Sequence, residues 1–377
     1  MNIRLIKERG ATKLGTAAAH RRGCGKSINN RNAGWFHGAD ARIVQDGGTG
    51  MLGSETRQPI GGRSGRLITI ETSRGIFAAF EAVPVTGVRE RQPALLVPGY
   101  TGSKEDFLLI LQALAAAGRQ VIAIDMRGQY ETPGGDDAAA YQLDALAADV
   151  AMIADWLGSG RADPAGDGPP PRGIHLLGHS LGGLVAREVL LAGAARISSL
   201  TLMSSGPGAL SGPRAAVLSE LLAELDGTGP AGLRAEVERI WKTRMEPEAV
   251  AGGVPTGIID FLRTRLLQSS PTGLRAMGET LLSCPDRTPA LAELGDVPLM
   301  VVYGENDDAW PPDVQDLMAR QLGAERTCIP GAAHSPAIDA PVTTASSLTE
   351  FWNAAERRQP TVHACGRGQH QTAASPR

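Results

Sequence analysis

The sequence predicts an α/β protein in which a mostly parallel, doubly wound sheet is interrupted by an inserted helical cap. Two observations predict this fold class. Short apolar segments of strand length alternate with helical patterns over residues 64–205 and again over 295–358, as in a parallel sheet with helices on both faces. Between them, residues 206–294 keep a largely helical apolar spacing with Pro and Gly at the joints, which indicates an insertion of helices.

The first core segment opens with a hairpin. Residues 66–73 and 76–83 are apolar runs separated by Arg74 and Gly75, a spacing typical of two antiparallel strands. The alternation of strand and helix then begins, with a strand at 93–99, a helix at 107–117 and a strand at 120–126.

A long amphipathic helix follows, because apolar residues recur there at steps of three and four: Leu143, Leu146, Val150, Ile153 and Leu157. The remaining core strands are expected near 174–178, 198–205, 298–304 and 326–331, and a final helix near 348–355. Within the insertion, helices are expected near 217–225, 233–241, 258–267 and 274–282.

The two ends of the chain differ from the core. Residues 1–63 are basic and lack sustained periodicity, and residues 359–377 also lack it, so both are predicted to be disordered tails. The basic N-terminal tail leaves open the recruitment of an anionic partner.

Composition and charge limit the function classes. The 377 residues carry a formal net charge of −3, which gives no overall reason to expect a nucleic acid as partner. The four cysteines are widely separated, which favours reduced thiols over a zinc site or a disulfide framework. The sequence begins without an apolar signal segment, and its apolar stretches are too short to span a bilayer. We therefore expect a cytoplasmic protein that acts on a small molecule, in an oligomeric state that the sequence leaves open.

The segment Leu176–Leu184, LLGHSLGGL, places a serine at a strand-to-helix corner. A nucleophile on such a sharp turn has a strained backbone, so the residues two before and two after it must lack side chains. Gly178 and Gly182 satisfy that need around Ser180. The alternative is a glycine-rich turn that only packs a helix on a strand. The amide of Leu181, at the start of the helix, is expected to stabilise a developing oxyanion.

A serine nucleophile needs an imidazole base. The tails hold His20, His37, His363 and His370, a buried strand holds His175, and His179 is adjacent to the serine on the strained turn. His334, in a loop after the last strand, remains as the expected base. The alternative is a histidine on a surface loop.

The imidazole needs a carboxylate partner, and two adjacent aspartates follow the strand that ends at Gly304. Asp307 is the predicted partner and Asp308 the alternative, and the one not used is expected to cap the helix that opens at Pro311 and Pro312. The amide of Tyr100, after Gly99, is the expected second oxyanion donor. The alternative is that this loop is a simple turn.

Two further motifs give weaker evidence for a functional role. Residues 22–27, RGCGKS, end like a phosphate-binding loop, but His20 stands where that motif requires its first glycine, and no strand precedes it. Residues 125–128, DMRG, close a strand and are expected to brace the site, with a direct substrate contact from Arg127 as the weaker alternative.

Over about residues 66–358 the chain resembles the α/β-hydrolase family. The segments that carry the resemblance are VPGYTGSKEDF (97–107), AIDMRGQYETPG (123–134), GHSLGG (178–183), YGENDDAWP (303–311) and GAAHSP (331–336). The family's oxyanion loop usually begins His-Gly, whereas this chain has Pro98-Gly99, which puts the support of the loop in doubt. The resemblance implies a serine acyl-enzyme and neither a cofactor nor a metal.

These observations predict a serine hydrolase that cleaves a carboxylic ester or thioester of a small, mostly apolar substrate. Amide hydrolysis, carbon–carbon bond hydrolysis and cofactor-free perhydrolysis share the same nucleophile and stay open. A receptor of the same fold, which binds a small ligand without turnover, is the alternative from another class.

Overall fold

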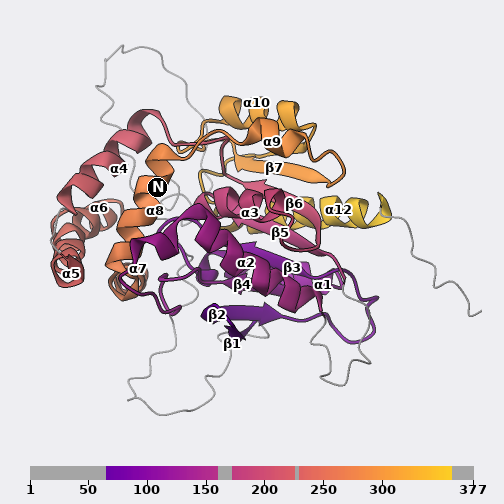
Figure 1. Cartoon of the computed structure of the whole chain (residues 1–377), viewed down its shortest axis with the longest axis horizontal. Coiled ribbons are helices and arrows are strands. Elements are labelled where there is room, and N and C mark those ends of the chain that lie inside the picture. Colours follow the sequence, from indigo (N-terminus) through magenta and orange to yellow (C-terminus); the bar gives the residue numbers. More distant parts are fainter. Residues whose placement is uncertain (1–64, 160–171, 226–228, 359–377) are drawn as a thin grey trace, which may run out of the picture.

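The computed structural model describes residues 65–159, 172–225 and 229–358, and they are arranged around one sheet (Figure 1). Within these ranges the sheet has eight strands in the order β1-β2-β4-β3-β5-β6-β7-β8. The strands are β1 (Arg66–Thr72), β2 (Gly75–Ala82), β3 (Ala94–Val97), β4 (Val121–Ile124), β5 (Ile174–His179), β6 (Ile197–Met203), β7 (Leu299–Gly304) and β8 (Glu325–Ile329).

The strands from β3 to β8 run parallel, and the predicted hairpin of β1 and β2 joins the edge of the sheet antiparallel to β4. The chain leaves β3 toward β4 on one side and leaves β5 toward β6 on the other. The order therefore reverses between β3 and β5, and in open α/β sheets such a switch point opens a crevice beside the carboxyl ends of the strands.

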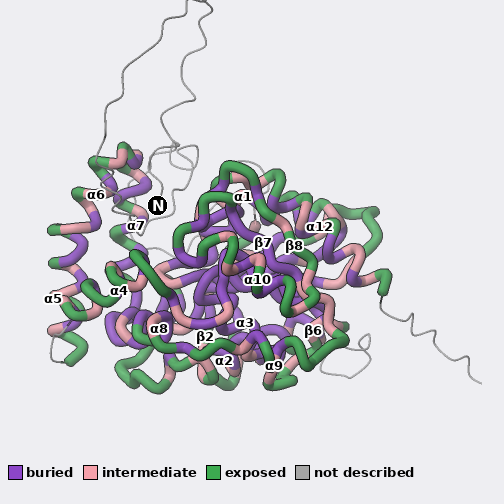
Figure 2. Tube along the Cα trace, turned by 90° about the horizontal axis from the view of Figure 1, so that it is seen from above, coloured by how far each residue is buried: buried purple, intermediate pink, exposed green. Residues whose placement is uncertain are grey.

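Helices cover both faces of the sheet. One face carries α1 (Leu108–Ala116) and α12 (Pro341–Arg358), and the other carries α2 (Leu143–Gly158), α3 (Leu181–Leu191) and α10 (Pro312–Leu322). Strand residues alternate between the two cores, as in β4, where Ile122 and Ile124 pack in one apolar cluster and Val121 and Ala123 in the other. Buried segments are concentrated in the interior of the molecule in Figure 2, and exposed segments lie along its outside.

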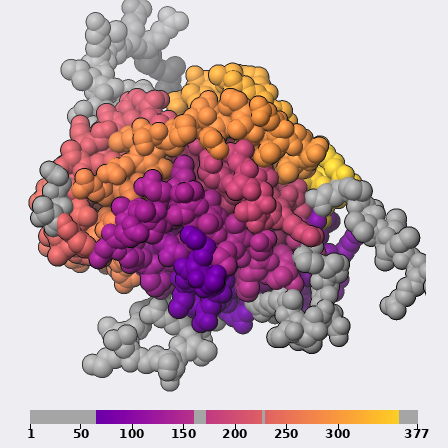
Figure 3. All heavy atoms as spheres, viewed as in Figure 1, coloured from indigo at the N-terminus to yellow at the C-terminus, as the bar shows by residue number. Residues whose placement is uncertain are grey.

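The segment between β6 and β7 is helical. It holds α4 (Gly212–Glu224), α5 (Gly229–Ile240), a π-helical turn (Trp241–Met245), α6 (Glu246–Ala251), α7 (Thr256–Gln268), α8 (Pro271–Ser283) and α9 (Thr288–Ala292). From α4 to α8 these helices share an apolar cluster of their own around the fully buried Trp241. They lie at one end of the molecule in Figure 1, and their atoms meet those of the core along a continuous surface in Figure 3.

Some elements differ from the expected ones. The last helix begins at Pro341, well before the expected stretch near 348–355. Short 3₁₀ helices, which the spacing does not predict, occur at Lys104–Phe107 and Ala138–Tyr141. The spacing does not predict the π-helical turn either; Pro247 follows it and has no N–H to continue the regular helical bonding, so the hydrogen-bond register changes there.

Several expectations fall on residues outside the described ranges. They concern both tails, the RGCGKS segment, Cys24 and Cys365. Cys284 and Cys328, which are described, are not in disulfide bonds. None of the helices in the described ranges has both the length and the apolar character that a membrane span requires.

Candidate active site

Ser180 occupies the sharp corner between β5 and α3. Its backbone has φ 54° and ψ −119°, in the positive-φ region that is unfavourable for a residue with a side chain. The surrounding backbone holds this conformation. The Ser180 amide donates a hydrogen bond to the carbonyl oxygen of Met203 (2.9 Å), and the Ser180 carbonyl oxygen accepts one from the hydroxyl of Ser205 (2.8 Å).

Glycine is required on either side of the corner, because a side chain there would clash with the backbone of a neighbouring segment. A Cβ at Gly178 would lie 2.1 Å from the carbonyl oxygen of Gly182, and a Cβ at Gly182 would lie 2.4 Å from that of Val97 on β3. These neighbours are backbone atoms, which cannot turn aside as a side chain can. The sequence suggests that these glycines are needed for steric reasons, and the close contacts in the fold agree with that explanation.

Three side chains that are distant in sequence meet at this corner. His334 Nε2 lies 3.0 Å from Ser180 Oγ, and His334 Nδ1 lies 2.8 Å from Asp307 Oδ1. Each comes from a loop at the carboxyl end of a strand: Ser180 after β5, His334 after β8 and Asp307 after β7. All three residues are buried. Ser180, His334 and Asp307 thus form one continuous hydrogen-bonded chain.

The carboxylate of Asp307 is held by further donors. Oδ1 also accepts the amide of Ala309 (3.0 Å), and Oδ2 accepts the side-chain amide of Gln315 (2.9 Å). Burial alone would raise the pKa of Asp307, but His334 and these hydrogen bonds together lower it below its ordinary value. Asp307 is therefore ionised at neutral pH and favours the form of His334 that is protonated on Nδ1. Gln315 was missed by the sequence analysis, because nothing local marks it among the polar residues of α10.

Asp308 points elsewhere. Its Oδ1 accepts a hydrogen bond from Nη2 of Arg214 on α4 at 2.7 Å. The prediction that the unused aspartate caps the next helix is wrong, since α10 begins at Pro312 without a side-chain cap. The physical reason is that the guanidinium of Arg214, which is almost fully buried, requires an anionic partner.

His179 is a second histidine at the site, and the sequence does not indicate a role for it. Its Nε2 lies 2.8 Å from the carbonyl oxygen of His334, and the two rings are 5.1 Å apart. Burial, together with the nearby His334, lowers the pKa of His179 to about 4. The ring is therefore neutral at pH 7 and donates its Nε2 proton to that carbonyl, which positions the backbone of His334.

The oxyanion loop, residues 98–103, packs directly against the corner. A Cβ at Gly99 would lie 3.0 Å from the Cβ of Ser180, so glycine permits the close approach. Gly99 and Tyr100 line the same pocket as Ser180 and His334. Leu181 is the first residue of α3. The two amides predicted as oxyanion donors, those of Tyr100 and Leu181, therefore belong to two segments that adjoin Ser180.

The support that Pro98 cannot give to the oxyanion loop comes from other residues. Gln129 Nε2 donates to the carbonyl oxygen of Gly99 (2.8 Å), and its Oε1 accepts the amide of Met126 (3.0 Å). Asp106 accepts the amide of Ser103 (3.3 Å). None of these supports was predicted, because each depends on a contact that forms only in the fold.

Asp125 and Arg127, the two charged residues of the DMRG segment, have different roles. Asp125 accepts hydrogen bonds from the Lys104 amide (2.7 Å) and from its Nζ (2.9 Å), next to the oxyanion loop. Arg127 instead binds Asp149 on α2 (2.7 Å) and the carbonyl oxygen of Arg74 (2.7 Å). Asp125 therefore braces the site as expected, whereas Arg127 joins α2 to the hairpin and is not among the residues that line the pocket.

The pocket at Ser180 lies between the core and the helical insertion. Leu210, Arg214 and Leu281 come from the insertion segment, and Ala309 comes from the loop after β7. The space there is narrow and partly open to solvent. The helical insertion thus contributes two leucines and one cation to the pocket that Ser180 also lines.

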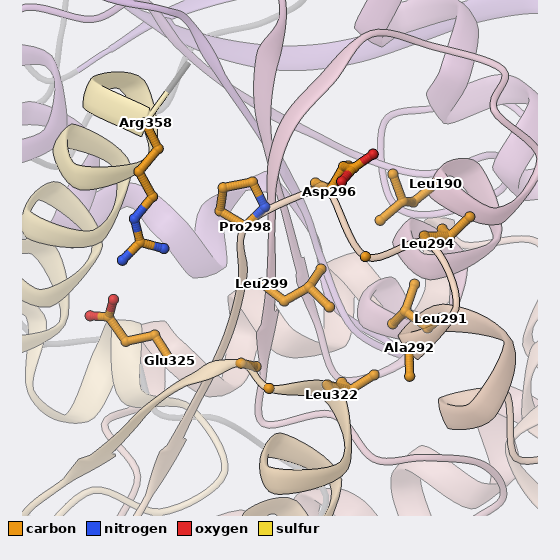
Figure 4. A pocket seen from close by; sticks show the side chains of 14 residues that line it. Leu190, Leu291, Ala292, Leu294, Asp296, Pro298, Leu299, Leu322, Glu325 and Arg358 are labelled. Atoms are coloured by element: carbon orange, nitrogen blue, oxygen red, sulfur yellow. The ribbon is translucent and has the colours of Figure 1, made fainter. Parts of the chain in front are cut away.

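A more spacious hollow lies at the amino ends of β7 and β8 (Figure 4). Its lining includes Leu190, Asp296, Glu325 and Arg358, and no serine, histidine or cysteine is among the described residues that form it. Its described lining therefore lacks a serine or cysteine nucleophile and an imidazole base, and size alone does not make it a catalytic site. Within the described ranges, no group of three or more His, Cys, Asp and Glu residues is placed to hold a metal ion.

Comparison with known proteins relates this site to a family. The description "Alpha/beta hydrolase family" belongs to the family model that matches residues 94–346, which is more than half of the chain. The putative carbamate hydrolase RutD of Variovorax paradoxus is 37% identical over 156 residues, covering 41% of this chain and 52% of the relative. The dihydrolipoyllysine-residue acetyltransferase component of the acetoin cleaving system of Pseudomonas putida is 35% identical over 116 residues, covering 30% of this chain and 26% of the relative. This chain thus spans about half of one curated relative and about a quarter of the other.

Solved structures share the fold. A thermophilic esterase from Thermogutta terrifontis superposes with a TM-score of 0.55 at 22% identity, covering 77% of this chain and 99% of that one. The enol-lactonase of Burkholderia xenovorans superposes with a TM-score of 0.55 at 18% identity, covering 76% of this chain and all of that one. At such identities the likeness concerns the fold alone. With the family match over residues 94–346, it follows that this chain belongs to the alpha/beta hydrolase family.

Proposed function

We propose that this protein is a hydrolase that cleaves a carboxylic ester or thioester of a small, mostly apolar substrate through an acyl-enzyme on Ser180. The observation that carries the proposal is the contact of 3.0 Å between Ser180 Oγ and His334 Nε2, with Asp307 hydrogen bonded to the other ring nitrogen. A serine hydroxyl at neutral pH needs such a base to become a nucleophile.

Acylation follows from the positions of these atoms. His334 Nε2 accepts the proton of Ser180 as Oγ bonds to the carbonyl carbon of the substrate. The carbonyl oxygen becomes an oxyanion, which the amides of Tyr100 and Leu181 stabilise. The bond to the leaving group then breaks, and His334 returns its proton to the departing oxygen or sulfur. The proposed steps use only groups of this chain.

Deacylation repeats the sequence with water. His334 takes a proton from the water molecule as its oxygen attacks the acyl carbon, and Ser180 leaves with that proton. Asp307 stays ionised throughout and stabilises the imidazolium that forms twice in the cycle. Its lowered pKa, which results from His334 and the hydrogen bonds to the carboxylate, supports this role.

The same nucleophile serves several acyl-transfer reactions. Cleavage of a C–N bond is the alternative with a specific observation in its favour, because the relative from Variovorax paradoxus is named as a putative carbamate hydrolase. Carbon–carbon bond hydrolysis and perhydrolysis would use Ser180 in the same way. We also propose a cytoplasmic location, on the grounds of the separated cysteines.

Labelling with a fluorophosphonate probe, combined with hydrolysis of p-nitrophenyl butyrate, tests the proposal. The wild type should be labelled and should hydrolyse the ester, and Ser180→Ala should do neither. If the wild type is labelled but does not hydrolyse the ester, cleavage of a C–N bond is the favoured reaction. An absence of labelling in a folded wild type would favour a receptor that does not turn over its ligand.

A further inference from the structure

A second pocket lies inside the helical insertion, next to the active site. Its walls come from α4, α5, α7 and α8, and include Leu221, Leu225, Val237, Ile240, Leu266 and Leu274. The pocket is narrow and partly open to solvent, and none of the described side chains that line it is charged. Such a lining offers water few hydrogen-bond partners, so the pocket favours hydrocarbon.

Tyr100 connects this apolar pocket to the active site, because it lines both. Its hydroxyl donates a hydrogen bond to the carbonyl oxygen of Leu274 at 2.9 Å. Burial, with Glu279 nearby, raises the pKa of the phenol, so this donor stays protonated. A Cβ at Gly278 would lie 3.1 Å from the hydroxyl oxygen, so glycine there lets the ring approach α8. The side chain of Tyr100 therefore anchors against the insertion, at the boundary of the two pockets.

The order of the strands indicates which part of a substrate the apolar pocket would hold. Ser180 follows β5, Tyr100 follows β3 on one side of it, and His334 follows β8 on the other side. The leaving group must lie near His334, which gives it a proton. The described core residues that line the apolar pocket, Tyr100 and Thr101, come from the loop after β3, and none of them comes from the loops after β7 and β8. The pocket is therefore on the side of the acyl part of the substrate, which remains after the leaving group has gone.

We propose that the apolar pocket binds the aliphatic acyl chain of the substrate, so that the protein prefers medium-length acyl esters over acetyl esters. This inference rests on the proposed function and gives it a substrate class. Each methylene that enters the pocket should raise kcat/KM by up to about fourfold, until the chain reaches the end of the pocket.

The test is a series of p-nitrophenyl esters from acetate to dodecanoate, measured on three proteins. In Val237→Trp the indole fills the pocket, so the ratio of kcat/KM for the octanoate to that for the acetate should fall at least tenfold from the wild-type ratio. The matched control is Leu233→Trp, which adds a comparable bulk one turn earlier on α5, in the core of the insertion and outside the pocket lining. The control should keep the wild-type ratio.

Enlarging the pocket gives a second measurement, which remains valid if Val237→Trp does not fold. Leu225→Ala should move the optimum to a longer chain. The inference is overturned if the wild type shows no gain beyond the acetate, or if a folded Val237→Trp and Leu225→Ala both keep the wild-type length profile.

A binding measurement separates this inference from the proposed function. Ser180→Ala should bind 1-octanol, measured by calorimetry, and the additional change Val237→Trp should weaken that binding at least tenfold. If 1-octanol binds in this way but no ester is cleaved by the wild type, the reaction is wrong and the chain-binding pocket stands. If esters are cleaved but 1-octanol binds equally well to both proteins, the reaction stands and the pocket assignment is overturned.

Discussion

The carboxylate of Asp106 lies 2.7 Å from Nη1 of Arg265, and both side chains are almost fully buried. Asp106 also accepts the amide of Ser103 in the oxyanion loop, whereas Arg265 belongs to α7 of the helical insertion. This ion pair therefore connects the insertion to the loop that carries the Tyr100 amide. The ion pair therefore supplies part of the support for the oxyanion loop that Pro98 cannot give.

Removing one partner should leave a buried charge unpaired. We expect Arg265→Met to lower the free energy of unfolding by about 3 to 5 kcal/mol and to lower kcat for p-nitrophenyl butyrate. Adding Asp106→Asn removes the unpaired charge, so the double variant should regain stability. It should not regain kcat, because the link from the insertion to the loop is still missing. Urea unfolding and steady-state kinetics measure the two effects, and recovery of kcat together with stability would show that the pair does not position the loop.

The two adjacent aspartates should differ sharply in their effect on catalysis. Asp307→Asn should lower kcat by about 10³- to 10⁴-fold with little change in fold, because an amide neither fixes the tautomer of His334 nor stabilises its cation. Asp308→Asn is the matched control, since its carboxylate binds Arg214 instead. Its kcat should stay within a few-fold of the wild type, although its stability should fall, because the buried Arg214 loses its anionic partner. Equal losses in the two variants would contradict the assignment.

His179 should make stability fall as the pH is lowered. Its pKa is about 4 in the folded protein and about 6.5 when unfolded, so below pH 6.5 the unfolded chain takes up a proton that the folded chain does not. Its contribution is complete above pH 6.5 and is lost as the pH approaches 4. Between pH 7.5 and 5 we expect a loss of about 2 kcal/mol.

Urea unfolding of the wild type and of His179→Asn at both pH values measures that contribution. The asparagine cannot titrate, so the variant should lack this part of the pH dependence. Identical pH dependence in the two proteins would show that His179 is not the group responsible.

The corner glycines should tolerate no added methyl group. In Gly178→Ala the new Cβ would lie 2.1 Å from a backbone oxygen, so the corner has to move. We expect a loss of about 2 kcal/mol or more in stability and a loss of most of the activity. Gly135→Ala is the control, because nothing lies within 4 Å of its added Cβ. Thermal unfolding and ester hydrolysis compare them, and a fully active Gly178→Ala would contradict the steric explanation.

The sequence predicted those parts of the fold whose causes are local. The glycines around Ser180 are needed by one sharp turn, and the apolar strands of the core are needed by a sheet that is buried on both faces. His334 was identified by elimination, since the other histidines fall in the tails, in a buried strand or next to the nucleophile. The α/β-hydrolase fold and family are confirmed by the family match and the structural comparisons.

The supporting residues could not be predicted, because their roles depend on contacts between distant segments. Gln315 reaches Asp307 from α10, Gln129 reaches Gly99 from the loop after β4, and Arg265 reaches Asp106 from the insertion. Asp307 and Asp308 are neighbours in sequence, and only the fold places Arg214 beside the second of them. Polar residues of this kind look like ordinary surface residues until the partner is known.

The central claim is that Ser180 carries the acyl group during turnover. Rapid mixing with p-nitrophenyl butyrate, acid quenching and mass spectrometry of the intact protein and its peptides test it most directly. We predict a mass increase of one butyryl group on the peptide that contains Ser180, and no such adduct in Ser180→Ala. An adduct on another residue, or hydrolysis that continues in Ser180→Ala at the wild-type rate, would contradict the account.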